Sequence, residues 1–534
     1  MIVIAFVLQE QSAFRAIRRT LNIPYFCPNN IRRILSFCTH TSPEAAVVPA
    51  ETSLGTEKES KEGEAKSLSW RIEKLSKGDS VSSAFRRWMG DGLPIHRGEI
   101  FHTINRLRRL KSTKRALEVM EWVIRERPYR PKELDYSYLL EFTMKFHGVA
   151  QGETLFSRIP SEFQNEQLYN NLVLGCLERG LIRLSLAYMK KMRELGHTIS
   201  YLAFNRLIIL HSSPRRRKAI PKILTQMKAD KVTRHVSTYN ILMKIEANDH
   251  NIEGLVKVFG DMKRMMVEPN EISYCILAVS HAVARLYTAC EVYVEVIKKS
   301  MTGNNWSTLD ILVILYGYLG DWKELERTWS MIEELPYVRG KSFLLAIEAF
   351  GKIGNLGRAE ELWHEMVSKK GLKSTEQFNS MIGVYCKKGL ITKATGLYKD
   401  MEKSGCKPNA ITFRHLALGC SRAGLLKEAT RTLELGSEFV ASVKIRRSTP
   451  WLEATLAMVE VFAENGDVET VEKLFEELKN ANYTRYTFVY NSLIKVYVKA
   501  KVYEPNLLRR MILGGSRPDA ETYSLMKLIE EFRP

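Results

Sequence analysis

The chain has 534 residues, of which 45% are hydrophobic and 10% aromatic, so it holds enough apolar material for a large core or a long repeat array. Lysine and arginine number 80 against 60 acidic residues, and the formal charge of +20 favours a polyanionic partner such as a nucleic acid. No apolar run reaches the roughly 18 residues that a membrane span needs, and the eight cysteines include no C-x-x-C and no disulfide-framework spacing. The composition therefore excludes a membrane-spanning protein and a disulfide-stapled scaffold, and it predicts free thiols in a reducing compartment.

The first 43 residues form a basic leader with five arginines and a single acidic residue, Glu10. Residues 14–19 can form a short helix that is apolar on one side and arginine-rich on the other. This composition is typical of a mitochondrial transit peptide, although chloroplast leaders overlap with it and remain the alternative. Residues 44–66 are polar, charged and poor in large apolar side chains, which predicts a disordered linker.

A repeat with a step of 35 residues follows. Residues 67–165 are expected to be helical with degenerate repeats, and regular repeats begin at 166, 201, 236, 271, 306, 340, 375 and 410. The fourth place of each repeat is aromatic or leucine, and the fifteenth is glycine in five of the eight and polar in the others. We expect the array to cover 166–444, with an irregular insertion at 445–451 and further repeats over 452–534.

Each repeat predicts two helices. In the repeat that begins at 375, Asn379–Cys386 is apolar at helical spacing and Gly389 supplies a stop. Residues 390–403 form a second amphipathic helix, and Lys407-Pro408-Asn409 ends it. One helix pair cannot bury its own apolar face, so neighbouring pairs must stack. The predicted fold class is all-α, a right-handed superhelical solenoid of helix-turn-helix repeats of about 35 residues.

Four short segments carry a family resemblance. Residues 238–242 (TYNIL), 489–494 (VYNSLI), 407–409 (KPN) and 517–519 (RPD) resemble the consensus of P-class pentatricopeptide repeat (PPR) proteins of plant organelles. A tetratricopeptide array would show a period of about 34 residues and a sustained W-x-x-L-G-x-x-Y pattern, which is not found here. The resemblance implies an array that binds organellar single-stranded RNA, one base per repeat, through the fifth and last residues of each repeat.

Asparagine recurs at the fifth place, and its carboxamide both donates and accepts hydrogen bonds, so it can pair with a pyrimidine edge. At any single position a helix cap or a solvated polar residue is the simpler interpretation, but the recurrence in one column favours base contact. The base-contact candidates that the resemblance implies are Asn170, Ser200, Asn205, Asn240, Asn270, Asn305, Asn379, Asn409, Asn491, Asp519 and Ser524.

By the family's pairing habit, three of these pairs would contact C or U: Asn240 with Asn270, Asn379 with Asn409, and Asn491 with Asp519, the last favouring U. Other repeats carry fifth residues that are not usual base readers, so no contiguous RNA target follows from the sequence. These residues are Cys275, Leu344, Arg414 and Leu456.

Phosphate contacts require cations beside the base-reading column. Lys387 and Arg422 are both thirteenth in their repeats, at the predicted end of a first helix. The densest basic cluster, between the two helices of the repeat that begins at 201, is Arg215, Arg216, Arg217 and Lys218. A second basic cluster lies within residues 106–115. Either cluster could equally be a solvated face or meet a protein or ribosomal RNA.

The signatures of catalysis are missing from the sequence. No histidine is followed two places on by glutamate, so the zinc deaminase signature is absent, and no G-x-x-x-x-G-K-[ST] phosphate loop occurs. We therefore predict no enzyme, no cofactor, no metal site and no small-molecule substrate. The predicted function is selective RNA binding in the mitochondrion, acting by occupancy in transcript processing, stabilisation or translation. The alternatives are a structural subunit of the mitochondrial ribosome and a protein scaffold.

Overall fold

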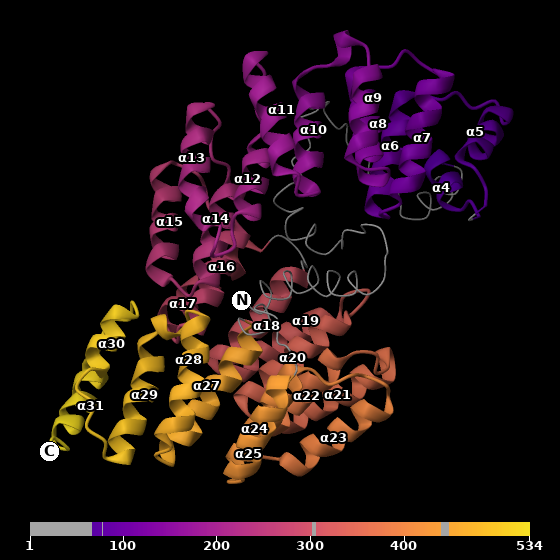
Figure 1. Cartoon of the computed structure of the whole chain (residues 1–534). Coiled ribbons are helices and arrows are strands. Elements are labelled where there is room, and N and C mark those ends of the chain that lie inside the picture. Colours follow the sequence, from indigo (N-terminus) through magenta and orange to yellow (C-terminus); the bar gives the residue numbers. More distant parts are fainter. Residues whose placement is uncertain (1–66, 77, 302–305, 439–447) are drawn as a thin grey trace. The chain divides into compact units, whose positions relative to one another are not determined.

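The computed structural model describes residues 67–76, 78–301, 306–438 and 448–534, and the regular structure within these ranges is entirely helical (Figure 1). The leader and the linker predicted for residues 1–66 lie outside the described residues. The described chain divides into two compact units. The N-terminal unit ends at Ile241, and the C-terminal unit runs from Leu242 to Pro534.

The N-terminal unit contains successive helix pairs and two short 3-10 turns. Its elements are α4 (Leu68–Glu73), α5 (Val81–Gly90), α6 (Arg97–Arg109), α7 (Thr113–Glu126), α8 (Glu133–Phe146), α9 (Val149–Arg158), η1 (Ser161–Phe163), α10 (Glu166–Glu178), α11 (Ile182–Glu194), α12 (Tyr201–Leu210), η2 (Arg217–Ala219), α13 (Ile220–Ala229) and the first part of α14 (Val236–Asn248).

The C-terminal unit continues the same alternation of first and second helices. Its elements are the rest of α14, α15 (Ile252–Arg264), α16 (Glu271–Val283), α17 (Tyr287–Ser300), α18 (Trp306–Leu319), α19 (Trp322–Glu333), α20 (Gly340–Ile353), α21 (Leu356–Lys370), α22 (Thr375–Lys387), α23 (Ile391–Lys403), α24 (Ala410–Arg422), α25 (Leu426–Glu438), α27 (Thr449–Glu464), α28 (Val468–Asn480), η3 (Tyr483–Arg485), α29 (Thr487–Ala500), α30 (Leu507–Leu513) and α31 (Ala520–Glu530).

The repeat starts predicted from the sequence are confirmed, because 166, 201, 236, 271, 306, 340, 375 and 410 are each the first residue of a helix. A polar residue before several of these helices explains the register. The side chains of Asn165, Ser374 and Asn409 accept hydrogen bonds from backbone amides of the helices that follow them. Such caps satisfy amides that have no partner inside the helix. The all-α solenoid of helix-turn-helix repeats is thus the observed fold.

The glycine column ends the first helices. Gly320, Gly354 and Gly389 have φ angles of 78°, 103° and 71°, in the left-handed region that a residue without a Cβ enters at little cost. Three of the eight regular repeats place other residues at the same fifteenth position, and two of these have a left-handed backbone. His250 and Arg285 adopt φ angles of 56° and 59°, so these two side chains are held in a conformation that disfavours them.

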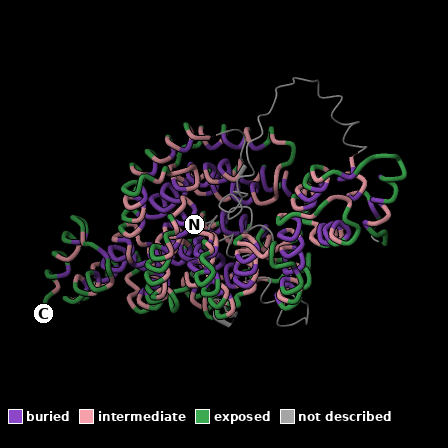
Figure 2. Tube along the Cα trace, turned by 90° about the horizontal axis from the view of Figure 1, so that it is seen from above, coloured by how far each residue is buried: buried purple, intermediate pink, exposed green. Residues whose placement is uncertain are grey.

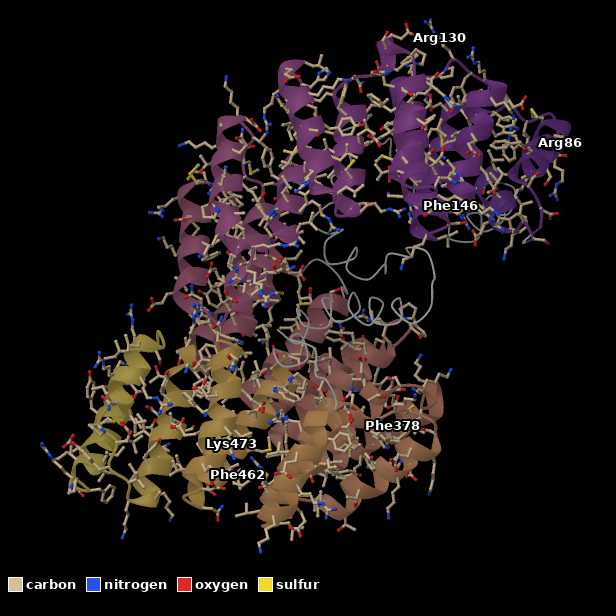
Figure 3. The ribbon with its side chains drawn as sticks, viewed as in Figure 1. Arg86, Arg130, Phe146, Phe378, Phe462 and Lys473 are labelled. Carbon is tan, nitrogen blue, oxygen red and sulfur yellow. The ribbon has the colours of Figure 1, made fainter. Side chains whose placement is uncertain are left out.

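The regular period has a packing basis, because first helices pack against their own second helix and against the first helix of the next repeat, as α22 does with α23 and α24. Phe378, in the fourth place of its repeat, is completely buried, as is Phe343 one repeat earlier. Figure 2 shows buried residues along the helix faces that meet neighbours and exposed residues on the opposite faces. In Figure 3, Phe378 and Phe462 lie among packed helices, whereas Lys473 is exposed on α28.

One boundary differs from the sequence expectation. Helix α27 begins at Thr449, inside the stretch 445–451 that the sequence predicted to be irregular. Pro450 stands at the start of this helix, where its missing N–H costs no hydrogen bond and its fixed φ suits the first turn.

Six cysteines fall in the described chain and none of them is in a disulfide, with five buried. Burial raises the pKa of the Cys176 and Cys290 thiols to about 12, so both are unreactive packing residues. Among the described residues, no helix is long and apolar enough to cross a membrane.

Candidate nucleic-acid interface

The fifth and last residues of the repeat that begins at 375 are in direct contact. Asn379 Nδ2 donates a hydrogen bond to Asn409 Oδ1 at 3.2 Å, and Thr412 Oγ1 donates to Asn379 Oδ1 at 2.8 Å. Asn409 also accepts from the backbone amides of Ile411 and Thr412. The Asn379 carboxamide is therefore held in one orientation by the capping box of the next repeat.

The same arrangement recurs in the repeat that begins at 487. Thr522 Oγ1 donates to Asn491 Oδ1 at 2.7 Å, and Asn491 Nδ2 donates to both Asp519 Oδ1 at 3.1 Å and Glu521 Oε2 at 2.9 Å. An asparagine carboxamide has two donor hydrogens and two acceptor lone pairs. Asn491 thus keeps only an acceptor site, whereas Asn379 keeps one donor and one acceptor for a base edge.

The N-terminal unit shows two further variants of the contact. Asn170 Oδ1 accepts from the backbone amide of Ser200 at 2.8 Å, while its Nδ2 donates to the Glu166 and Thr198 carbonyl oxygens. Asn205 Nδ2 donates to Ser237 Oγ at 3.0 Å, and its buried Oδ1 has no hydrogen-bond partner. Asn205 therefore keeps acceptor capacity, and Asn170 keeps one lone pair.

The last residues of the repeats are N-terminal caps of the following first helices. Ser200, Asn270 and Asp519 each accept from a backbone amide in the next helix, as Asn409 does. These residues of the last column are therefore helix caps, which was the simpler interpretation of the polar residues in the sequence. It does not apply to the fifth column, whose asparagines lie inside the first helices.

The remaining base-contact candidates lie in other settings. Asn240 is buried on α14 in the N-terminal unit, while Asn270 caps α16 in the C-terminal unit. Ser524 is exposed, and its hydroxyl donates to the Ala520 carbonyl oxygen at 3.0 Å. Asn305 lies outside the described residues.

Two fifth residues of opposite charge are engaged by internal ion pairs. Asp310 lies 2.5 Å from Arg339 Nη2, and Arg414 Nη2 lies 2.7 Å from Glu477. The Arg414 guanidinium also lies 3.8 Å from the centre of the Trp451 ring. At these two repeats the fifth residue is committed to packing within the array.

The thirteenth residues of three repeats contact one carboxylate of the chain itself. Lys387 Nζ lies 3.8 Å from Glu453 Oε2, and Lys352 Nζ lies 2.9 Å from Glu453 Oε1. The hydroxyl of Tyr318 donates to the same carboxylate. Tyr318, Lys352 and Lys387 are each thirteenth in successive repeats, and only Lys387 was singled out from the sequence.

The electrostatics of Glu453 follow from this convergence. Burial alone would raise its pKa, but the charges of Lys352 and Lys387 and the hydrogen bonds from Tyr318 and Lys352 outweigh burial and lower the pKa to about 2. Burial in turn lowers the pKa of Lys352, and the Glu453 charge opposes that shift. The site is therefore an ionised carboxylate held by two cations and one phenol.

The other predicted cations fall into two groups. Arg215, Arg216 and Lys218 are exposed in the turn between α12 and α13, and Arg217 Nη2 donates to the Ser212 carbonyl oxygen. Arg422 is exposed, and its Nη1 donates to the carbonyl oxygen of Lys387 at 2.6 Å.

Three of the six basic residues within 106–115 make contacts inside the fold, and the other three are exposed. Arg106 Nε lies 2.8 Å from Glu73, and Arg108 pairs with Glu141. The Arg115 guanidinium donates to the carbonyl oxygens of Ile72 and Glu73. These arginines hold α4, α6, α7 and α8 together, a role that the local sequence does not reveal.

Stacked helix pairs at a 35-residue step, with paired polar residues at the fifth and last places, define an α-solenoid of the helical-repeat class. A PPR repeat family model matches residues 234–280 and 373–422, a PPR repeat model matches 168–197, 342–370 and 456–483, and a pentatricopeptide repeat domain model matches 188–249. A mitochondrial pentatricopeptide repeat-containing protein of Arabidopsis thaliana is 61% identical over 532 residues, covering 100% of this chain and 99% of the relative. A second mitochondrial protein of that name and organism is 28% identical over 79% of this chain and 70% of its own length.

The chain belongs to the pentatricopeptide repeat family. Its relatives are named as mitochondrial, and this chain is a mitochondrial protein as well. Among solved structures, the pentatricopeptide repeat protein PPR10 in complex with an 18-nt psaJ RNA element is 18% identical, with a TM-score of 0.34 over 98% of this chain and 80% of that one.

Proposed function

We propose that this protein binds single-stranded RNA in the mitochondrion through the fifth and last residues of its repeats, as a P-class member of its family. It acts by occupancy, in transcript processing, stabilisation or translation. The observation that carries the proposal is the Asn379–Asn409 pair, whose fixed carboxamide keeps one donor and one acceptor. The formal charge of +20 supports a polyanionic partner.

The hydrogen bond from Thr412 is part of this argument. It fixes the Asn379 carboxamide before any base arrives, so less side-chain freedom is lost on binding. In the equivalent pair, Asn491 donates to the Asp519 carboxylate. The donors and acceptors that remain on this pair therefore differ from those on Asn379 and Asn409. The two repeats should therefore prefer different base edges.

A binding assay with a matched pair of variants tests base contact. Asn379→Ala should weaken binding of the preferred single-stranded RNA by about 1–3 kcal/mol, because one base loses its hydrogen bonds. Asn465→Ala is the control, since Asn465 is an exposed asparagine at the end of α27 whose Nδ2 donates to the Val461 carbonyl oxygen. Equal affinities for folded Asn379→Ala and wild type would refute base contact at this repeat.

Crosslinking of the tagged protein in purified mitochondria, followed by sequencing of the protected RNA, tests the cellular role. Short footprints in particular transcripts would support a selective RNA factor. Footprints confined to ribosomal RNA would favour a structural subunit of the mitochondrial ribosome. That second role is favoured by the internal ion pairs that engage Asp310 and Arg414, because these repeats contribute shape and charge without reading a base.

A further inference from the structure

The C-terminal unit contains contacts that stacking of neighbouring repeats cannot explain. Neighbouring repeats bring together residues about one repeat apart in sequence. Here Lys352 meets Glu453 at a separation of 101 residues, and Arg285 meets Glu460 at a separation of 175. His250 Nδ1 lies 3.0 Å from the Tyr486 hydroxyl, 236 residues away.

These contacts form an ordered series that we name the clasp. As the residue on the earlier side moves toward the N-terminus, its partner on the later side moves toward the C-terminus. The two stretches therefore meet in antiparallel order. The clasp residues are His250, Arg285, Tyr318, Lys352 and Lys387 on the earlier side and Glu453, Glu460, Tyr486 and Phe488 on the later side.

The earlier side of the clasp contains the three cations Arg285, Lys352 and Lys387, and the later side is acidic and aromatic. Arg285 Nη2 lies 3.2 Å from Glu460 Oε1, and its guanidinium lies 4.2 Å from the centre of the Phe488 ring. The thirteenth-place cations Lys352 and Lys387 both face Glu453. A carboxylate of the chain itself thus faces these cations, and Lys387 is one of the residues predicted to contact RNA phosphate.

Two clasp residues carry full side chains at a backbone position that favours glycine. The fifteenth place is glycine in five of the eight regular repeats, but His250 and Arg285 adopt the left-handed conformation there with full side chains. A non-glycine residue in this region is disfavoured, and the contacts of these two side chains offset part of that cost. Both side chains reach the C-terminal repeats.

We propose that the clasp is an autoinhibitory closure, in which Glu453 competes with RNA phosphate for Tyr318, Lys352 and Lys387. The inference rests on the proposed RNA binding and adds a closed state to it. RNA binding exchanges the Glu453 carboxylate for a phosphate and separates the two sides of the clasp. The unbound protein is closed, and the RNA-bound protein is open.

A charge-matched pair of variants tests the competition, with a 20-nucleotide oligouridylate as the probe. Glu453→Gln should raise the affinity about tenfold, because the cations lose a charge-assisted competitor. Glu469→Gln removes the same charge from exposed Glu469 on α28, which pairs with Lys473 outside the clasp. Its affinity should rise only slightly.

Hydrogen exchange of the 483–488 backbone measures closure directly. Addition of the oligouridylate to the wild type should speed exchange there. Arg285→Gly should do so without RNA, because it removes a clasp side chain and relieves the strained backbone. Lys501→Gly is its control, since exposed Lys501 has a φ of 55° and lies at the fifteenth place of its repeat. This pair keeps the test valid if Glu453→Gln fails to fold.

Two results would overturn the clasp alone. One is RNA binding by the wild type with equal affinity gains for Glu453→Gln and Glu469→Gln. The other is RNA binding that leaves exchange at 483–488 unchanged or slower. If neither the wild type nor any variant binds oligouridylate or mitochondrial RNA, the proposed function fails and the clasp proposal fails with it.

Discussion

At the scale of the residue, the last place of each repeat has two roles. Asn409 caps α24 through the amides of Ile411 and Thr412, and it also holds Asn379 through its Oδ1. The cap is a matter of local backbone chemistry, whereas the contact with Asn379 requires the stacking of two repeats. A single asparagine therefore links the stability of one helix to the orientation of the candidate base reader in the previous one.

Asn409→Ala should lower the free energy of unfolding by about 1 kcal/mol, because the first amides of α24 lose their acceptor. The same change frees the Asn379 carboxamide, so the affinity for RNA should fall as well. Urea unfolding and RNA titration of one preparation measure both effects. Asn355→Ala removes the cap of α21 at a position outside the last column, and it should change stability alone. Equal loss of RNA affinity in both variants would contradict the orienting role.

His415 is a buried titratable residue close to the clasp. Burial, and then the charge of Lys387, lower its pKa to about 3, against the opposing charge of Glu453. Its ring also packs on Gly383, where an added Cβ would lie 3.1 Å from Nε2. The folded protein keeps this imidazole neutral under conditions where the unfolded chain takes up a proton.

The neutral state of buried His415 should make the protein less stable as the pH falls. Stability from neutral His415 is complete above about pH 6.5 and is lost as the pH falls toward the folded pKa, by up to about 1.4 kcal/mol per pH unit. His415→Gln cannot titrate, so its urea midpoint should fall less than that of the wild type between about pH 7 and about pH 5. Parallel pH profiles for the two proteins would show that His415 titrates normally.

At the scale of the element, the first helices of neighbouring repeats approach closely. Gly351 on α20 faces Val384 on α22, and a Cβ at Gly351 would lie 2.3 Å from Val384 Cγ2. Only a residue without a side chain permits this separation. The spacing of α20 and α22 places the fifth residues of successive repeats side by side, so the packing of the helices sets the geometry of the candidate interface.

Gly351→Ala should therefore lower the free energy of unfolding by about 1–3 kcal/mol, because the helices must separate to admit the methyl group. Gly396→Ala, in the middle of α23 where an added Cβ meets nothing within 4 Å, should raise it by about 0.5–1 kcal/mol. Chemical denaturation of the two variants provides the comparison. If both substitutions stabilise the protein, then the space between α20 and α22 accommodates a methyl group at position 351.

At the scale of the whole molecule, the clasp is the feature that goes beyond the repeat. Within the C-terminal unit, Lys352 and Glu453 link two stretches of the array that are not stacked on each other. Removal of one partner from a largely desolvated pair leaves the other charge less well compensated, so the cost of each single change exceeds the net value of the pair.

This coupling is measurable. Lys352→Met and Glu453→Gln should each lower the free energy of opening at Tyr486, obtained from native-state hydrogen exchange. The double variant should lose less than the sum of the two, by about 1 kcal/mol or more, because the residues are in contact. Strict additivity would indicate that the two side chains act independently.

The sequence by itself determined the repeat, its register and its helix boundaries. The starts at 166, 201 and 375 are confirmed to the residue, because helix caps and glycine stops are local signals that depend on a few neighbouring residues. The pairing of Asn379 with Asn409 was also expected, because it spans a single repeat whose geometry is regular, and the structure adds the hydrogen bond between them. The expectation that residues 445–451 are irregular was wrong at the end of that stretch, where Thr449 and Pro450 begin α27.

Only the tertiary structure decided which charged residues face each other. Lys387 was expected to be available to phosphate, yet Glu453 lies beside it from a repeat further along the chain, and Arg115 binds carbonyl oxygens near Ile72. Such partners depend on the curvature of the array, which is the sum of small rotations from repeat to repeat. No local pattern of residues encodes that sum, and so the clasp at Glu453 is visible only once the repeats are stacked.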